Sequence, residues 1–422
     1  MSVSVWQQSP GETKNYSCDV AIIGAGIIGA YSAYTLAKQG RKVAVLETRF
    51  PAAGATGRNA GMCTMGAATN YANGVDRFGR EKARELWLLT LENQRKTRAF
   101  IEAFGTPADY CGGVSLAVSP QESEVLERAC TLLGEDGFEV SFSPTDPYGR
   151  GFEAALFQPA NFGLDPVALV KALLENAGEN LRLFAPEEVF GIHSANAGQL
   201  LVEARGINVS CEQVALCTNA YSPVLTSYFK DKIFPTRGQI LLTAPLKRRV
   251  LDKVASANAG YEYFRQLADG SFLLGGGRDQ HQQLEVGYDE TPTAWLQATL
   301  EEFLQKYFPD VTAEVPILRR WAGTMGFSVD GLPMVGQLPY IPGLFKPLES
   351  SSVALPPDFH AVQIPPGSSN IWFSAGFTGH GMGWGMVITD FMLSQMSGQR
   401  SDGGLFDVSR FPNKGDVTGV SL

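Results

Sequence analysis

The chain has 422 residues, of which 44% are hydrophobic, and it carries a formal net charge of -9 with only 34 lysines and arginines. This length and composition predict a globular protein of two or three domains. The acidic balance excludes nucleic acid and an anionic membrane surface as expected partners, because both require a basic patch.

No apolar run reaches the roughly 18 residues that would suggest a membrane span, and the polar N-terminus lacks the apolar core of a secretory signal. The six cysteines form no C-x-x-C pair, and the four histidines are isolated from one another. We therefore expect a cytoplasmic protein with reduced thiols and no metal site.

The first predicted unit spans residues 19–47 in the order strand, glycine-rich turn, helix, strand. The apolar strand 20–23 runs directly into a turn with glycines at 24, 26 and 29. A helix follows over 30–36, a glycine at position 40 ends it, and a second apolar strand covers 43–46. This order is typical of a domain that binds a dinucleotide cofactor.

The glycines of this turn and the acid that closes the unit each have a mechanical role. Gly24 permits the tight turn, Gly26 lets the backbone approach a pyrophosphate, and Gly29 lets the helix pack closely on the strand. The free N–H groups of the helix N-terminus favour the phosphates. Glu47 lies 21 residues after Gly26, near the offset expected for an acid that binds an adenosine ribose. A turn that binds no nucleotide is the alternative, and the completeness of the unit argues against it.

The middle of the chain continues with helices and one further strand. A loop rich in Gly and Ala covers 53–61, and the amphipathic stretch 80–104 predicts one long scaffold helix. Asp165 caps a predicted helix that starts at Pro166 and ends near residue 177. A strand at 214–217 then ends in the polar segment 218–221.

The character changes to β over residues 234–277, where strands are expected at 239–243 and 271–274. This stretch predicts a second domain inserted into the first. Prolines and serines crowd 339–369, which predicts a surface excursion. The last unit, 371–384, reads as a strand, a glycine loop and the start of an apolar helix.

Six segments carry a family resemblance when they are taken in chain order. They are the 24–29 turn, 54–61, 218–221, 235–239, 321–323 together with 330–336, and 376–381. Together they resemble the FAD-dependent D-amino-acid oxidase superfamily, particularly its glycine-oxidase-like and γ-glutamylputrescine-oxidase-like branches.

The resemblance implies an α/β fold with two domains. The first is an FAD-binding Rossmann-like domain that the chain leaves and re-enters, over 1–85, 150–225 and 320–422. The second is an inserted antiparallel β-sheet substrate domain over 86–149 and 226–319.

The resemblance also implies that FAD is bound without a covalent link. Relatives with attached FAD have a histidine where this chain has Arg58 and Asn59, or a cysteine near Trp321, where it has alanine, glycine and threonine. A cofactor as long as FAD needs a second glycine-rich loop near its ring. The residues expected to bind FAD are Gly24, Gly26, Ile27, Gly29, Glu47, Thr48, Arg49, Ala55, Thr56, Arg58, Asn59, Ala60, Gly61, Met62, Val189, Thr218, Asn219, Gly376, Thr378, Gly379, His380, Gly381 and Met382.

The substrate side departs from the glycine-oxidase pattern. Relatives of that kind bind the substrate carboxylate with arginines at two places, where this chain has Met325 and Gly379. Because a buried carboxylate without a cationic partner is costly, we expect a secondary or substituted amine rather than a simple α-amino acid. The arginines that could restore carboxylate binding from another strand are Arg265, Arg278 and Arg320.

His380 and Tyr263 are the candidates for catalysis. His380 can donate to the flavin edge or orient the substrate, and the alternative is that it only satisfies backbone carbonyls. Tyr261 and Tyr263 resemble the family's substrate-contacting aromatic residue, with a core role as the alternative. Arg237 and Arg320 are expected to form structural ion pairs rather than to act in catalysis.

The implied activity is oxidation of a C–N bond in an amine or amino acid, by hydride transfer to flavin N5 and hydrolysis of the imine. Oxygen as acceptor would make the protein an oxidase, and a quinone or protein acceptor would make it a dehydrogenase. A flavin-binding subunit of a heteromeric amine oxidoreductase and an NAD-only dehydrogenase are further alternatives. An FAD monooxygenase is disfavoured, because the strand before the 376–381 loop lacks a Gly-Asp pair. The sequence does not predict the oligomeric state.

Overall fold

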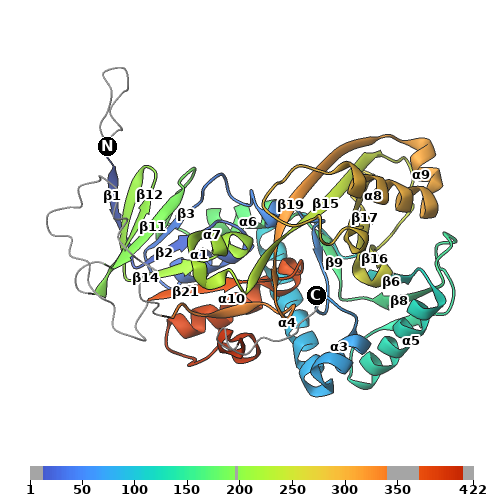
Figure 1. The fold of residues 1–422 in the computed structure, drawn as a ribbon, viewed down its shortest axis with the longest axis horizontal. Coiled ribbons are helices and arrows are strands. Elements are labelled where there is room, and N and C mark those ends of the chain that lie inside the picture. Colours follow the sequence, from blue (N-terminus) through green and yellow to red (C-terminus); the bar gives the residue numbers. More distant parts are fainter. Residues whose placement is uncertain (1–12, 195–197, 340–369, 412–422) are drawn as a thin grey trace.

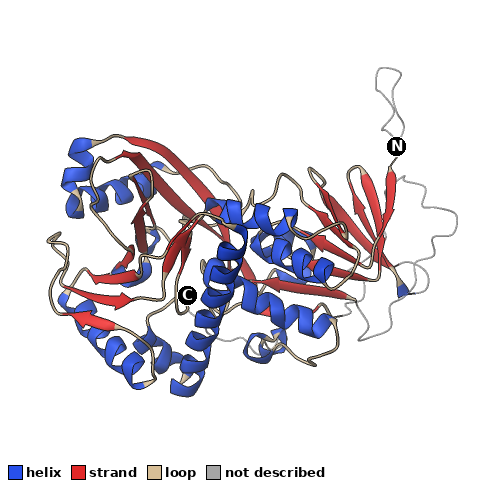
Figure 2. Cartoon of the chain, turned by 180° about the vertical axis from the view of Figure 1, so that it is seen from behind, coloured by secondary structure: helices blue, strands red, loops and turns tan. Residues whose placement is uncertain are grey.

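The computed structural model describes residues 13–194, 198–339 and 370–411, so most of the predicted excursion 339–369 lies outside the described residues. Two large sheets occupy the two ends of an elongated molecule (Figure 1). Seen from behind, a long helix passes between the two ends (Figure 2). It is α4, Arg80–Phe104, as the sequence predicts.

A six-stranded sheet forms the core of the first end. Its order is β10-β3-β2-β14-β21-β20, and only β20 runs antiparallel to its neighbour. The strands are β2 (Val20–Ile23), β3 (Val43–Leu46), β10 (Leu181–Phe184), β14 (Gln213–Leu216), β20 (Met334–Gln337) and β21 (Ile371–Ala375).

This sheet is buried on both faces, which explains why its strands are uniformly apolar. Val20 and Ile22 face a helical layer, whereas Ala21 and Ile23 face a second, four-stranded sheet. The helices are α1 (Ile27–Lys38), α4, α6 (Pro166–Glu175) and α10 (Gly381–Met396). The small sheet has the order β1-β13-β12-β11, with β1 Lys14–Ser17, β11 Val189–Ser194, β12 Leu200–Ala204 and β13 Ile207–Cys211.

An eight-stranded sheet forms the second end, in the order β19-β15-β18-β17-β16-β6-β8-β7. All neighbouring strands are antiparallel except β16 and β6. The strands are β6 (Gly113–Ala117), β7 (Ser141–Ser143), β8 (Ala154–Gln158), β15 (Ile233–Pro245), β16 (Val254–Ala257), β17 (Glu262–Gln266), β18 (Ser271–Gly275) and β19 (Ile317–Ser328). Helices α5 (Pro120–Glu135), α8 (Ala294–Tyr307) and α9 (Pro309–Glu314) accompany it.

Short elements join the two ends. The strands β4 (Met62–Cys63), β5 (Ala108–Asp109) and β9 (Phe162–Leu164) form a three-stranded sheet. The remaining α-helices of the described part are α2 (Ala55–Arg58), α3 (Tyr71–Phe78) and α7 (Ser222–Leu225).

The predicted fold class is confirmed, with differences in detail. Strands β8 and β19 belong to the eight-stranded sheet, although the sequence ranges gave residues 150–225 and 320–422 to the cofactor domain. β19 is held there by pairing with β15, far away in sequence, whereas β8 pairs with β6 and β7, which lie in the predicted range 86–149. The last helix begins at Gly381 rather than near residue 384, because its glycine-rich start reads as loop in sequence.

Candidate active site

A single large cavity connects the two ends of the molecule. Its volume is about 1980 Å³, roughly twice that of the largest common drug-sized sites. The glycine turn before α1 lines one part, and the inner face of the eight-stranded sheet lines another. The cavity is therefore large enough for a long cofactor and a small substrate together.

The glycine turn has the geometry that the sequence predicts. Gly24 has a φ of +100°, which only glycine adopts readily, and a Cβ there would lie 2.8 Å from the carbonyl oxygen of Cys217. A Cβ on Gly29 would lie 1.9 Å from the carbonyl oxygen of Gly24. The tight turn and the close helix packing are thus confirmed, and Gly26 and Ile27 are left on the cavity wall.

Glu47 lies at the end of β3 with its carboxylate fixed on the cavity wall. Its Oε2 accepts a hydrogen bond from the backbone N–H of Ala25 at 2.9 Å, and its Oε1 accepts one from Arg49 at 3.0 Å. Each carboxylate oxygen has a second lone pair that can accept a hydrogen bond from a ligand hydroxyl. The side chain is therefore oriented before any ligand binds.

The loop that contains α2 is shaped by its own side chains. The Asn59 amide donates to the carbonyl oxygens of Ala55 and Thr56, and its Oδ1 accepts from the N–H of Gly61. Arg58 donates to the carbonyl oxygen of Ala322 on β19 at 2.7 Å. The Asn59 bonds stabilise the loop itself, and the Arg58 bond holds the loop against the eight-stranded sheet.

The second glycine-rich loop, 376–380, joins β21 to α10 in a left-handed conformation. Gly376, Thr378 and Gly379 have φ values of +76°, +48° and +80°. The side chain of Asn219 accepts a hydrogen bond from the N–H of Gly376 at 3.0 Å. A positive φ at a threonine is strained, and such strain gathers at functional sites.

His380 ends this loop and lines the cavity. Its Nδ1 lies 3.1 Å from the carbonyl oxygen of Thr378, and because a carbonyl only accepts, Nδ1 carries the proton. Burial lowers the pKa of His380, so the ring is neutral near pH 7. Its Nε2 is consequently a hydrogen-bond acceptor. The carbonyl contact considered from sequence is present, and it leaves this second nitrogen available.

One part of the cavity wall on the eight-stranded sheet is apolar and aromatic. Tyr263, Met325 and Phe327 lie on this face, and burial raises the pKa of Tyr263 to about 12. A Cβ on Gly379 would lie 3.5 Å from Sδ of Met325. The two positions where the resemblance places arginines therefore meet, and neither carries a charge.

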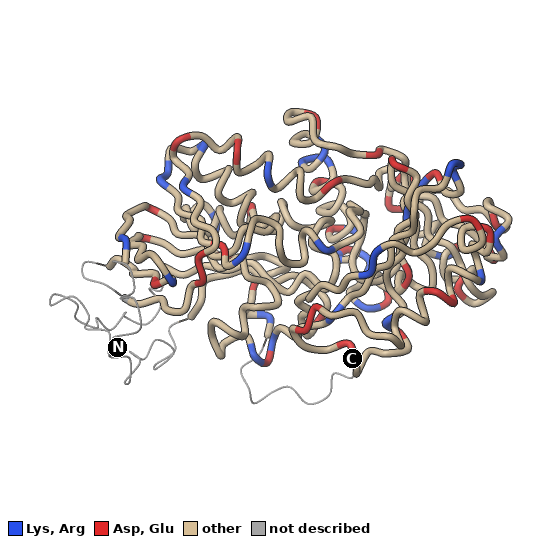
Figure 3. Tube along the Cα trace, turned by 90° about the horizontal axis from the view of Figure 1, so that it is seen from above, with Lys and Arg blue, Asp and Glu red and all other residues tan. Residues whose placement is uncertain are grey.

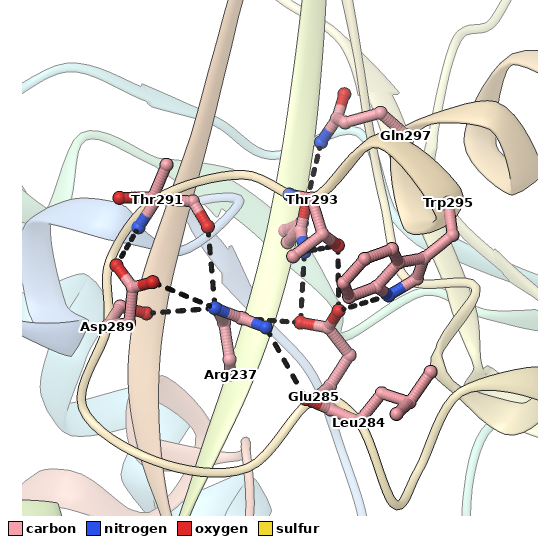
Figure 4. A network of polar contacts seen from close by, with 9 residues as sticks. Arg237, Leu284, Glu285, Asp289, Thr291, Thr293, Trp295 and Gln297 are labelled. Atoms are coloured by element: carbon pink, nitrogen blue, oxygen red, sulfur yellow. Dashed lines mark hydrogen bonds and ion pairs between the residues drawn. The ribbon is translucent and has the colours of Figure 1, made fainter.

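Four arginines of this region have different surroundings. Arg237 pairs with the fully buried Glu285 on the opposite face of the sheet at 2.5 Å, within a network that Figure 4 shows in detail. Arg320 pairs with an acid of α8, so both expected structural ion pairs are confirmed. Arg265 donates to the carbonyl oxygen of Gly61 and does not line the cavity. Arg278 does line it.

Glu290 links the two ends of the molecule beside the cavity. This residue lies between β18 and β19 in the chain, yet it pairs with Arg49 at 2.8 Å and Arg58 at 3.0 Å. It also accepts a hydrogen bond from the hydroxyl of Tyr221. Sequence reasoning missed Glu290, because no motif marks an acid whose arginine partners lie more than 200 residues away.

Most of the predicted site residues lie on the wall of this one cavity. They are Gly24, Gly26, Ile27, Glu47, Thr48, Arg49, Ala55, Thr56, Arg58, Asn59, Ala60, Met62, Val189, Thr218, Asn219, Tyr263, Thr378, Gly379, His380, Gly381 and Met382. Gly29, Gly61 and Gly376 are not on the wall. Their lack of a side chain serves packing instead, since a Cβ on each would crowd a neighbouring residue.

Within the described residues, no helix is long and apolar enough to cross a membrane. The same residues contain no group of three or more potential ligands that could hold a metal ion. In the view of Figure 3, basic and acidic residues are interspersed along the described part of the chain. The residues predicted to bind the cofactor therefore have to be assessed in the cavity.

The comparison with known families decides the cofactor. The model of the DAO family, which is described as FAD dependent oxidoreductase, matches residues 19–392 of the chain. The chain belongs to the DAO family. It is therefore an FAD-dependent oxidoreductase, and the cavity is the place where its residues fit the cofactor. The oriented carboxylate of Glu47 and the side-chain-free approach at Gly26 suit the ADP half, and the 376–381 loop suits the flavin half.

Curated relatives of this DAO-family protein include two enzymes of different specificity. The chain is 24% identical to the gamma-glutamylputrescine oxidoreductase of Escherichia coli strain K12, over 90% of this chain and 84% of that one. It is also 24% identical to the glycine oxidase of Pseudomonas aeruginosa, over 77% of this chain and 87% of that one.

Solved structures share the fold. The glycine oxidase from Geobacillus kaustophilus superposes with a TM-score of 0.73 at 18% identity, covering 96% of this chain and all of that one. The L-proline dehydrogenase from P. horikoshii gives a TM-score of 0.70 at 20% identity, covering 92% and 95%. At this sequence identity, the structural similarity establishes the fold and does not identify the substrate.

Proposed function

We propose that this protein oxidises a C–N bond in an amine or amino acid. The α-carbon of the neutral amine loses a hydride equivalent to flavin N5, and water hydrolyses the resulting imine to a carbonyl compound and an amine or ammonia. FAD, when bound, would supply the two-electron acceptor, and oxygen or another acceptor would reoxidise it. Relatives named for oxidising glycine and γ-glutamylputrescine support an amine-bearing substrate.

The observation that carries the proposal is the composition of the cavity wall on the eight-stranded sheet. Tyr263, Met325 and Phe327 form an apolar surface there. Such a surface excludes water and disfavours the charged ammonium form, which cannot give up a hydride. A substrate amine in this place is therefore held neutral by its surroundings.

His380 is the proposed proton acceptor. Its Nδ1 donates to the carbonyl oxygen of Thr378, so Nε2 is the atom that can take the proton that a substrate ammonium loses when it becomes the neutral amine. Tyr263 is the proposed residue that positions the substrate. Neither role needs a second charged group, because the chemistry itself belongs to the cofactor.

The test is an anaerobic screen in which amines and amino acids are mixed with the purified FAD-loaded chain and loss of flavin absorbance is followed. At least one amine should bleach the flavin, and admission of air should restore the colour if oxygen is the acceptor. Bleaching that only a quinone reverses would identify a dehydrogenase. A single chain that no amine bleaches would favour a flavin-binding subunit over an enzyme.

The role of His380 has a matched control in the same chain. His380→Asn should slow flavin reduction by roughly a hundredfold or more at neutral pH, the range of general-base catalysis, with FAD content unchanged. His281→Asn, which alters a histidine bonded to Thr299 off the cavity wall, should leave the rate unchanged. Equal rates of flavin reduction in both variants would show that His380 is not the proton acceptor.

A further inference from the structure

Arg278 presents an unpaired cation to the cavity. It follows β18 through Gly276 and Gly277, whose φ values of +120° and +69° turn the chain sharply. Its guanidinium lines the cavity and lies 4.6 Å from the ring centre of Phe327. Among the described residues it makes no ion pair and no side-chain hydrogen bond, although burial lowers its pKa. A partly desolvated guanidinium without an anion is unfavourable unless a ligand supplies one.

Two acids, Asp279 and Glu285, act on Arg278 through their charges without an ion pair. Asp279, its neighbour in the chain, accepts a hydrogen bond from Asn258 on Oδ2, and its buried Oδ1 has no hydrogen-bond partner among the described residues. Glu285 is held by Arg237 and Gln239 on the other side of the sheet. Burial lowers the pKa of Arg278 and outweighs the charges of Glu285 and Asp279, which raise it. Among the described residues, neither acid forms an ion pair with the guanidinium.

The position of Arg278 is that of a substrate-binding group. Phe327 and Met325 lie two residues apart on β19, both on the cavity face. Through its contact with Phe327, Arg278 reaches the wall where Met325 and Gly379 meet without a charge. The phosphate-binding turn before α1 lies at another part of the same cavity, so a cofactor phosphate there has its own donors.

We propose that Arg278 binds a carboxylate of the amine substrate. This inference rests on the proposed function, because it assigns the anion to the molecule that is oxidised. The planar guanidinium fork matches a carboxylate in a two-point contact, and the ring of Phe327 holds the fork in place by a cation–π interaction. The substrate class is then an amine that also carries a carboxylate, which revises the expectation drawn from Met325 and Gly379 alone.

The experiment measures binding and needs no turnover. Benzoate and its uncharged counterpart benzamide are titrated into the FAD-loaded protein, and dissociation constants are obtained by calorimetry. Benzoate should bind the unmodified protein at least tenfold more tightly than benzamide. Arg278→Met should weaken benzoate roughly tenfold to a hundredfold and leave benzamide unchanged. Arg278→Lys should be intermediate, because an ammonium keeps the charge and loses the fork.

Arg320→Met is the matched control, since Arg320 lies off the cavity wall and pairs with Glu301. Its benzoate affinity should equal that of the unmodified protein. The proposal is overturned if Arg278→Met binds benzoate normally, if both ligands weaken equally, or if the unmodified protein does not discriminate between them. If the carboxylate preference depends on Arg278 but no amine bleaches the flavin, the proposed function fails and the anion site stands.

Discussion

Glu262 should make the stability of this protein fall as the pH rises. It is the first residue of β17, only 3% exposed, and it faces away from the cavity side occupied by Tyr263. Burial raises the pKa of Glu262 from 4.5 to about 7, and the nearby charges of Asp279 and Glu122 add to the rise. Its Oε2 has no hydrogen-bond partner among the described residues. The folded protein therefore binds the proton of Glu262 more tightly than the unfolded chain does.

This difference in proton binding sets the sign and the size of the pH dependence of the free energy of unfolding. Below pH 4.5 both states hold the proton, and Glu262 costs nothing. Between pH 4.5 and 7 only the folded state holds it, so the free energy of unfolding declines by about 1.4 kcal/mol per pH unit, or about 3 kcal/mol in all. Above pH 7 the loss is constant. Glu262→Gln keeps the shape without the charge, so it should be about 3 kcal/mol more stable than the unmodified protein at pH 8 and no more stable at pH 4.5.

The assay is urea denaturation of the FAD-saturated protein and the variant at pH 5 and pH 8. At each pH, the unfolding free energy of the unmodified protein is subtracted from that of the variant. This difference should be larger at pH 8 than at pH 5. Glu302→Gln alters an exposed glutamate of α8 and should shift stability by no more than about 0.5 kcal/mol at either pH. A Glu262→Gln advantage that is equal at both pH values would refute the argument that this carboxyl is protonated in the folded state.

Three further outcomes are expected. Heat or acid should release all FAD from the polypeptide, and flavin that stays with the denatured chain would disprove the predicted non-covalent binding. Glu47→Ala should weaken FAD binding roughly tenfold to a hundredfold in a fluorescence titration of the apoprotein, since one charge-assisted hydrogen bond is lost; unchanged affinity would remove Glu47 from the cofactor site. Arg237→Met should lower the unfolding free energy by about 3–5 kcal/mol, because it leaves Glu285 charged, buried and unpaired. A loss below about 1 kcal/mol in urea denaturation would contradict that assignment.

The sequence by itself determined the parts of the protein that depend on local pattern. The apolar runs around the 24–29 turn predict the two buried strands of a dinucleotide-binding unit, because strands buried on both faces need no alternation. Helix α4 and the capped start of α6 were readable because periodicity and capping are local signals. The positions of the two glycine-rich loops were also readable, since only glycine tolerates the backbone angles found at Gly24 and Gly376.

The tertiary structure alone decided which charged side chains reach the cavity. Arg265, Arg278 and Arg320 are equivalent candidates in sequence, yet only Arg278 lies on the cavity wall. The side of a strand that faces a ligand is set by what packs on each face, and the partners of these residues come from distant segments. For the same reason the meeting of Met325 with Gly379 could not be read from either residue, because long-range pairing of β19 with β15 and the return of the chain to α10 bring them together.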